Sequence, residues 1–286
     1  MADRNSPMVR RRRLGLELRR LREAAGKTGD EVAERLGWSA SKVSRIETGR
    51  IAAAWGDVSD LLDLYEVTDT AVRQTLIGMA RQSREKGWWQ SFGDVLSTGY
   101  ATLIGFETAA RELHVFEPLT VPGLLQTPGY AHAVMRSGAI DLSGDEIDRR
   151  VQVRLSRQAV LDGEDALKLW AILDQAVLTR QIGGPQVMAD QLAHLAALAH
   201  RPGITIQVIA FAEGAHAAMT GAFGIFEFPG EDPDIAYIDS VTGELYLERP
   251  SDVRTAKDAL EHLRATAAPI DASLRLIEQA ARSCQK

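Results

Sequence analysis

The sequence predicts two domains of different fold class: a mainly α N-terminal domain of five helices, and an α+β C-terminal domain with a small, mostly antiparallel sheet. The 286 residues are enough for two domains of ordinary size. Apolar residues recur with helical spacing through the first 85 residues, whereas alternating β-branched runs occur only beyond residue 100. We therefore expect one domain over residues 1–85, a connection over 86–100 and a second domain over 101–286.

The charge distribution supports the same division. Residues 1–50 hold 13 Lys and Arg against 7 Asp and Glu, whereas the rest of the chain holds 20 against 32. A basic segment joined to an acidic remainder is the asymmetry expected when only one part of a chain meets phosphate groups. The N-terminal domain is therefore the candidate for nucleic-acid binding.

The composition argues against secreted and membrane proteins. No apolar run is long enough to span a bilayer, and no apolar segment follows the N-terminal arginines as in a secretory signal. The single cysteine, Cys284, excludes a disulfide framework and agrees with a reducing compartment. We expect a cytoplasmic protein without a membrane partner.

The first predicted helix follows a run of four arginines. Leu14, Leu18 and Leu21 recur on one helical face, and residues 1–9 are predicted to be disordered. The run can be the solvated first turn of the helix or an arm that contacts phosphates or a minor groove. It consists of Arg10, Arg11, Arg12 and Arg13.

Residues 28–50 predict two short helices joined by a tight turn. Thr28 and Glu31 form a capping box, and Gly37 suits the left-handed end of a helix. Ser39 can cap the next helix, in which Val43 faces inward. A turn this short makes the helices cross steeply, which is typical of a helix-turn-helix. Two further helices over 55–65 and 69–80 complete the domain.

This segment resembles the XRE-type helix-turn-helix family, which shares the fold of phage repressors. The family pattern is matched by Glu31-Val32-Ala33, by Leu36-Gly37 and by Ser39 through Gly49. The resemblance implies a DNA-binding repressor fold whose third helix lies in the major groove, with its N-terminal residues against base edges. It also implies a homodimer on a two-fold-related site of double-stranded DNA.

Two positions depart from the family pattern. The family often has Gln directly after the second-helix cap and Gln at the second position of the reading segment; this chain has Gly29 and Ala40. Ala40 offers only a methyl group to a thymine, so base reading falls on Ser41, Ser44 and Arg45. Lys42 and Arg50 suit phosphates. The predicted DNA-binding residues are Thr28, Ala40, Ser41, Lys42, Ser44, Arg45 and Arg50, together with Arg10, Arg11, Arg12 and Arg13. Glu47 is predicted to pair with Arg19 or Arg20.

The C-terminal domain is predicted from alternating strand and helix signals. Helices are expected over 102–116, 145–161, 174–182, 185–199, 252–265 and 270–282, and strands over 167–173, 204–209, 223–228, 235–238 and 244–247. In the connection, Trp88 and Trp89 indicate either docking between domains or a ligand or partner surface. Arg154 and Arg157 lie on a basic helix that is either solvated or a site for an anionic partner.

The second domain resembles the C-terminal domain of unknown function found in many actinobacterial XRE-type regulators. The matching residues are Val121 through Thr127 with Tyr130-Ala131, Arg154-x-x-Arg157-Gln158, Leu173-Asp174-x-Ala176-x-Leu178, Gln191-Leu192-x-x-Leu195 and Gly214-x-His216. The family has no settled biochemical function, but the resemblance implies a regulator that is often encoded beside a small protein partner. We expect the second domain to receive a signal, from such a protein or from a small-molecule effector. The resemblance leaves open an antitoxin-like module that sequesters such a protein and autoregulates its operon.

No pattern indicates catalysis, a metal or a cofactor. Ser39-x-x-Lys42 has the spacing of a serine hydrolase motif, but it lies in the reading helix without companion motifs. The six histidines lack ligand spacing, and no phosphate-binding glycine loop occurs. His216, in a loop of small residues, is either a ligand or partner contact at an open pocket mouth or an ordinary loop histidine. We expect a regulator and not an enzyme.

Overall fold

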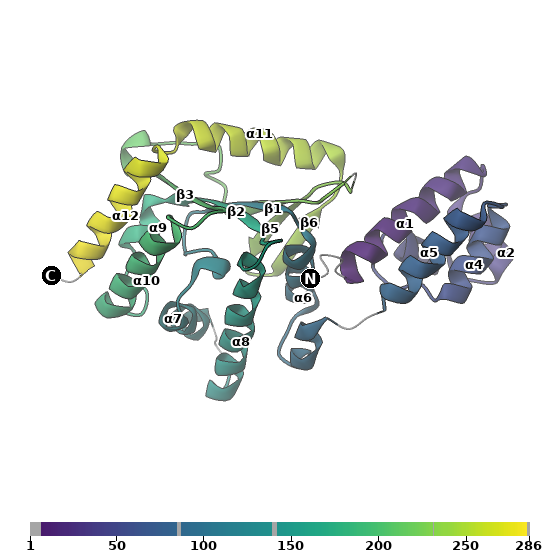
Figure 1. The fold of residues 1–286 in the computed structure, drawn as a ribbon, viewed down its shortest axis with the longest axis horizontal. Coiled ribbons are helices and arrows are strands. Elements are labelled where there is room, and N and C mark those ends of the chain that lie inside the picture. The colour runs from purple at the N-terminus through teal and green to yellow at the C-terminus, as the bar shows by residue number, and fades with distance from the viewer. Residues whose placement is uncertain (1–6, 85–86, 139–141, 231, 285–286) are drawn as a thin grey trace. The chain divides into compact units, whose positions relative to one another are not determined.

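The computed structural model describes residues 7–84, 87–138, 142–230 and 232–284 (Figure 1). The chain forms two compact units, residues 1–90 and residues 91–286, which we call the head and the body. The expected boundary at residues 85–86 and the first six residues lie outside the described part of the chain.

The head consists of five α-helices, as predicted. They are α1 (Pro7–Ala24), α2 (Gly29–Leu36), α3 (Ala40–Glu47), α4 (Trp55–Leu64) and α5 (Thr70–Gln82). Leu18, Val32, Ile46 and Leu62 are among the apolar side chains that form its single core. The helix α1 begins at Pro7, so the predicted disorder is wrong for residues 7–9.

The helices α1 and α3 touch through their backbones. A Cβ atom added at Gly15 of α1 would lie 2.5 Å from the carbonyl oxygens of Ile46 and Glu47. A Cβ at Gly49, which has φ = 66°, would lie 2.8 Å from the Cα of Arg12. Glycine at both positions therefore lets α1 fix the C-terminal end of α3.

The body is built from a sheet and seven α-helices in its described part. The helices are α6 (Thr98–Ala109), α7 (Pro128–Gly138), α8 (Gly144–Arg157), α9 (Gln175–Thr179), α10 (Pro185–Leu198), α11 (Pro250–Thr266) and α12 (Ile270–Cys284). The strands are β1 (Glu112–Glu117), β2 (Lys168–Asp174), β3 (Ile204–Ile209), β4 (Phe223–Glu227), β5 (Ile235–Ser240) and β6 (Gly243–Leu247). Short 3₁₀ helices are η1 (Trp88–Phe92), η2 (Gly123–Leu125), η3 (Gln158–Leu161) and η4 (Phe211–Glu213).

The sheet is mixed, which corrects the prediction of a small, mostly antiparallel sheet. Its six strands have the order β3-β2-β1-β4-β5-β6. The strands β1, β2 and β3 run parallel, whereas the β1–β4, β4–β5 and β5–β6 pairs are antiparallel. The error comes from residues 112–116, which were predicted as the end of a helix. The helix α6 ends at Ala109, and β1 then occupies the centre of the sheet.

The two faces of the sheet have different coverings. On β1, Phe116 points to the face covered by α11, where it packs in one cluster with Leu260 and Leu263. Leu113, Val115 and Glu117 point to the opposite face by the alternation of the strand. The helices α6, α7 and α8 lie on that side of the sheet in Figure 1. We call it the pocket face.

No helix in the described part of the chain is long and apolar enough to cross a bilayer.

Candidate functional site

The turn between α2 and α3 is built as the sequence predicts. The Thr28 amide donates to Glu31 Oε2 at 2.7 Å, and the Glu31 amide donates to Thr28 Oγ1 at 3.2 Å. Gly37 ends α2 in the left-handed conformation, with φ = 65° and ψ = 30°. Ser39 Oγ then accepts from the Lys42 amide at 3.2 Å and begins α3. Local capping alone therefore fixes where the reading helix starts.

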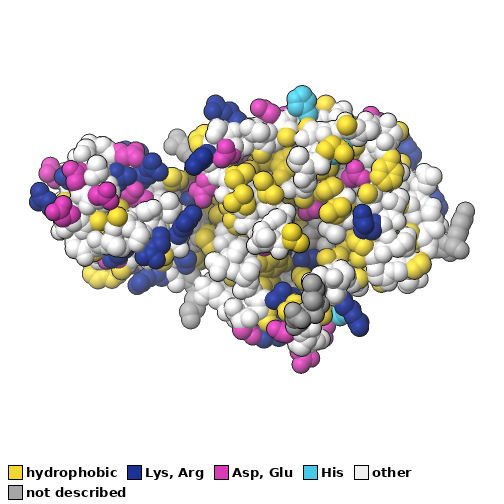
Figure 2. Space-filling view, turned by 180° about the vertical axis from the view of Figure 1, so that it is seen from behind, with side chains coloured by type: hydrophobic (Ala, Val, Ile, Leu, Met, Phe, Trp, Pro, Cys, Tyr) yellow, Lys and Arg dark blue, Asp and Glu magenta, His cyan; other side chains and the backbone are white. Residues whose placement is uncertain are grey.

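The predicted base-reading side chains share one exposed surface of α3. Ser41, Ser44 and Arg45 are exposed at spacings that place them on one side of the helix, while Val43 is buried on the other side. Arg45 Nε donates to the Ser41 carbonyl at 3.1 Å, which folds the guanidinium back along the helix. Ala40, Thr28 and Arg50 are also exposed. Figure 2 shows Lys and Arg side chains gathered along one side of the head.

Lys42 differs from its neighbours because its charge already has partners within the head. Its Nζ lies 3.1 Å from Asp57 Oδ1 and 3.6 Å from the centre of the Trp38 ring. The lysine side chain is 29% exposed. A phosphate contact by Lys42 has to share or replace the Asp57 contact, which no local sequence pattern revealed.

The arginine run lies in the first turns of α1 and does not form an extended arm, which was one of its two interpretations. Arg10 and Arg12 are 7% and 6% exposed, and Arg11 Nε donates to the Ser83 carbonyl at 2.8 Å. Burial lowers the pKa of Arg11. Only Arg13 of the run is exposed. The close approach of Gly49 to the backbone of Arg12 explains why this turn is packed.

Glu47 pairs with Arg22 and not with Arg19 or Arg20. Arg22 Nε lies 2.6 Å from Glu47 Oε1, and a second bond joins Arg22 to Glu47 Oε2 at 3.0 Å. Arg19 and Arg20 instead pair with glutamates of α1 itself. Arg22 is one helical turn beyond Leu18, which is buried, so its side chain reaches α3.

A hollow opens at the two positions that depart from the family pattern. Gly29 and Ala40 line the same depression, together with Ser44 of α3. A Cβ added at Gly29 would meet no other atom within 4 Å. The missing side chains therefore leave open space beside the exposed surface of α3.

The body has a polar pocket on the pocket face of its sheet. Its volume is about 160 Å³. One wall is formed by strand residues, including Glu117, Tyr237 and Asp239. The opposite side is formed by helix and loop residues: Tyr100, Glu107, Pro122, Gly123, Gln126, Arg154 and Arg157. The structure thus brings together the two arginines that the sequence assigned to an anionic partner.

Arg157 is neutralised inside the body. Its NH2 lies 2.6 Å from Glu107 Oε1, and the two side chains are 5% and 2% exposed. It also donates to the Tyr100 hydroxyl, and its guanidinium lies 4.9 Å from the centre of the Tyr100 ring. A buried arginine with a carboxylate partner is a structural ion pair, and losing one member leaves the other charge uncompensated. The solvated-helix interpretation is therefore wrong for Arg157.

Several residues of the family pattern hold one loop over the pocket. Gln126 Nε2 donates to the Val121 carbonyl at 2.7 Å, and Arg154 donates to Gln126 Oε1 at 2.9 Å. Gln158 and Gln191 donate to the backbone carbonyls of Gln126 and Leu125. These bonds satisfy buried backbone groups of an irregular segment and fix its path.

Two family models match this chain. Residues 13–76 match a helix-turn-helix domain, and residues 100–279 match a domain of unknown function, DUF5753. The second match covers more than half of the sequence. The chain belongs to the DUF5753 family. It is a DNA-binding regulator of the helix-turn-helix type. Comparison with curated proteins found no match, and comparison with solved structures found none either.

His216 of this DUF5753 protein is enclosed and does not line an open pocket mouth. Its side chain is 4% exposed, and its ring packs edge-on against Phe116 at 5.1 Å. The Ala218 amide donates to Nδ1 at 3.2 Å, and Nε2 lies 3.7 Å from Asp174 Oδ2. The histidine therefore ties its own loop to the end of β2. The sequence distance between His216 and Phe116 hid this contact.

The two connection tryptophans lie in η1 of the head. Trp89 is buried, whereas Trp88 is 40% exposed, and their rings meet edge-on at 6.0 Å. The pocket described above is formed by body residues alone. The ligand or partner role of Trp88 and Trp89 stays a prediction.

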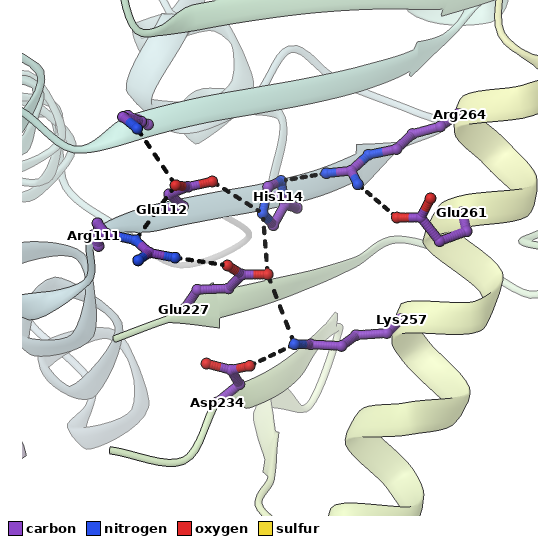
Figure 3. A network of polar contacts seen from close by, with 9 residues as sticks. Arg111, Glu112, His114, Glu227, Asp234, Lys257, Glu261 and Arg264 are labelled. Carbon is purple, nitrogen blue, oxygen red and sulfur yellow. Dashed lines mark hydrogen bonds and ion pairs between the residues drawn. The ribbon is translucent and has the colours of Figure 1, made fainter. Parts of the chain in front are cut away.

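A second polar cluster joins α11 to the other face of the sheet. Glu112, His114 and Glu227 bring ligand-type atoms within 4.8 Å of one another. Arg264 lies 2.9 Å from His114 Nδ1, and an arginine can only donate. The neutral ring thus carries its proton on Nε2, which faces Glu227 Oε1 at 3.5 Å (Figure 3).

The basic surroundings of this cluster fit an ion-pair network better than a metal centre. A metal would require a deprotonated Nε2, and the other ring nitrogen of a metal-bound histidine normally donates to an acceptor. Here that nitrogen faces Arg264. Arg111 and Lys257 also neutralise the carboxylates, with Lys257 2.5 Å from Asp234 (Figure 3). The cluster anchors α11 to the sheet.

Proposed function

We propose that this DUF5753 protein is a sequence-specific transcription regulator whose third helix enters the major groove. The observation that carries the proposal is the shared exposed surface of Ser41, Ser44 and Arg45 at the start of α3. Serine hydroxyls and arginine are side chains that read base edges. The helix is held from behind by α1 and by the Arg22–Glu47 pair, which fixes its orientation.

The head alone offers few direct contacts. The arginine run is packed, Lys42 shares its charge with Asp57, and Gly29 and Ala40 leave a hollow. Arg45 and Arg50 are exposed, and phosphate contacts supply much of DNA affinity. We infer that the protein acts as a homodimer, because two heads on half-sites about 34 Å apart double these contacts.

The body is the candidate for control of the head. The loop over its polar pocket and the two pocket arginines belong to the residues that carry the family resemblance. The proposal gives this pocket a binding role and no catalytic one. The antitoxin-like alternative, in which the body sequesters a small protein, stays a prediction. A small protein that co-purifies in stoichiometric amount from the native cell would favour it.

In vitro selection of random duplex DNA by the full chain tests the proposal. The expected result is an enriched sequence with two inverted half-sites whose centres are about 10 base pairs apart. A matched selection with the Ser41→Ala, Ser44→Ala, Arg45→Ala triple variant should lose the enrichment while the variant keeps its thermal unfolding midpoint. Recovery of no preferred sequence by the folded wild type would overturn the proposal.

A further inference from the structure

The pocket of the body is lined by carboxyl groups that lack partners. Neither the half-buried Glu117 carboxyl group nor the exposed Asp239 carboxyl group accepts a hydrogen bond from, or forms an ion pair with, any residue in the described part of the chain. Glu107 uses Oε1 for Arg157, but its Oε2 has no donor within hydrogen-bond distance among the described residues. This carboxylate is 2% exposed. A buried acceptor without a hydrogen bond costs about 1–3 kcal/mol, so a ligand that donates a hydrogen bond to this oxygen would be favoured.

The pocket has three carboxyl groups against two arginines. Arg157 is bound to Glu107 and Tyr100, and Arg154 NH1 is bound to Gln126. The Nε atoms of both arginines have no acceptor among the described residues, but an incoming anion that reached them would join the three carboxyl groups. An incoming cation meets unpaired acceptors instead, which favours a positively charged ligand.

The sheet wall is shaped to leave room at these acceptors. Tyr237 of β5 is paired with Gly224 of β4, and a Cβ at Gly224 would lie 2.2 Å from the Tyr237 ring. The absent side chain leaves the space over Gly224 to the ring and hydroxyl of Tyr237. Glu117 lies at the end of β1. The hydroxyl and the two strand carboxyl groups thus line one wall of the pocket.

We propose that this pocket binds a small organic cation, an alkylammonium or guanidinium group, through Glu117, Asp239 and the Tyr237 hydroxyl. The volume of about 160 Å³ is below the range of sites for drug-sized ligands, about 300–1,000 Å³, so the ligand is small. This proposal names the ligand class through which the body would control the head. The effect of the ligand on the head rests on the proposed function, whereas cation binding itself does not.

Binding of a cation to this pocket should release a proton, which gives a measurable sign of binding. Burial, and secondly the neighbouring Asp239, raise the pKa of Glu117 to about 8, so this carboxyl is largely protonated at pH 7. The groups that face it are Asp239 and Tyr237 of β5, Arg154 of α8 and Tyr130 of α7. A bound cation favours the carboxylate, so binding at pH 7 expels the carboxyl proton to solvent and tightens as the pH rises through about 8.

The test is titration calorimetry of the full chain with ethylammonium, 1,4-diammoniobutane and methylguanidinium. Size-matched 1-propanol and propionate are the neutral and anionic controls. Ligands are used up to about 10 mM, where dissociation constants near 1 mM are detected. We expect at least one cation to bind with proton uptake by the buffer, and neither control to bind.

The variants decide whether the pocket is responsible. Glu117→Gln should remove the proton release and weaken cation binding about tenfold, and Asp239→Asn should weaken it too. Glu213→Gln, which removes an exposed carboxyl outside the pocket, should leave binding unchanged. Failure of all three cations to bind the wild type, tighter binding of propionate, or equal binding by Glu117→Gln would overturn the proposal.

The same preparation separates this inference from the proposed function. If the selected DNA is bound but no cation binds, the ligand assignment fails and the regulator remains. If a cation binds with proton release but leaves DNA affinity unchanged, the site stands and the control of the head by the body fails.

Discussion

The head and the body place their polar groups in opposite ways. In the head, Ser41, Ser44 and Arg45 face outward from a helix whose apolar side is buried in a small core. In the body, Glu107, Arg157 and Gln191 face inward and are almost fully buried. Outward groups contribute little to stability and are free to read a partner, whereas inward groups stabilise the fold only when each is paired. The predictions below use this difference.

The largest expected effect is loss of the buried ion pair in the body. Arg157→Ala leaves the Glu107 carboxylate buried without its partner and should lower the free energy of unfolding of the body by about 3–5 kcal/mol. Denaturant unfolding and calorimetry of the variant and the wild type measure this loss of unfolding free energy. The double variant Glu107→Gln, Arg157→Met should recover part of the loss. A cost below about 1 kcal/mol for Arg157→Ala would show that the pair is solvated.

Removing the Glu117 carboxyl group from the pocket should instead raise the free energy of unfolding of the body. The pKa of Glu117 is raised by burial from 4.5 to about 8. Its favourable contribution to stability is therefore complete below about pH 4.5 and is lost as the pH rises through about 8. Glu117→Gln should stabilise the body by about 2–4 kcal/mol at pH 8 and by little at pH 4.5. Equal effects at the two pH values would contradict the raised pKa.

A matched pair of glycines tests the packing behind the reading helix. Gly15→Ala places a methyl group 2.5 Å from two carbonyl oxygens of α3 and should destabilise the head by about 1–3 kcal/mol. Gly29→Ala places the same group in open space and should change stability by about 0.5 kcal/mol or less. Thermal unfolding of the two variants compares them directly. Similar losses from both would mean that α1 does not press on α3.

The smallest expected effect is a pH slope from His114. Burial, and secondly Arg264, lower its pKa below 6.5. Its contribution to stability is therefore complete above pH 6.5 and is lost as the pH falls toward the lowered pKa. The loss of stability that comes from His114 alone should be about 1 kcal/mol between pH 7 and pH 5, and it should appear as a difference between the pH slopes of the wild type and of His114→Gln. An unchanged slope in the variant would assign the pH dependence to other groups.

The head was predictable because its signals are local. Thr28, Glu31, Gly37 and Ser39 set the helix ends within a few residues of themselves, so capping rules sufficed. The contacts of the head that were not predicted from the sequence join distant segments. They are Glu47 with Arg22, Lys42 with Asp57, and the arginine run with the end of α3. Periodicity identifies which side of a helix faces inward but not which partner it meets.

The body was harder to predict because its site depends on strand order. Residues 112–115 alternate between polar and apolar side chains, but Phe116 breaks the alternation and the preceding helix masked this short strand. Without β1 at the centre, the parallel pairing with β2 and the position of Glu117 beside Tyr237 were out of reach. Of the pocket residues, only Arg154 and Arg157 were predicted as site residues, and the partner of Arg157 lies fifty residues away.

The measurement that tests the central claim most directly is the binding of Arg45→Ala to the selected DNA sequence and to its single-base variants. The account predicts a loss of about 1–3 kcal/mol on the selected sequence and relaxed preference at one base pair of each half-site. Arg254→Ala, which removes an exposed arginine of the body, should leave both unchanged. An equal loss on every sequence would show that Arg45 contacts only the backbone and would contradict base reading by α3.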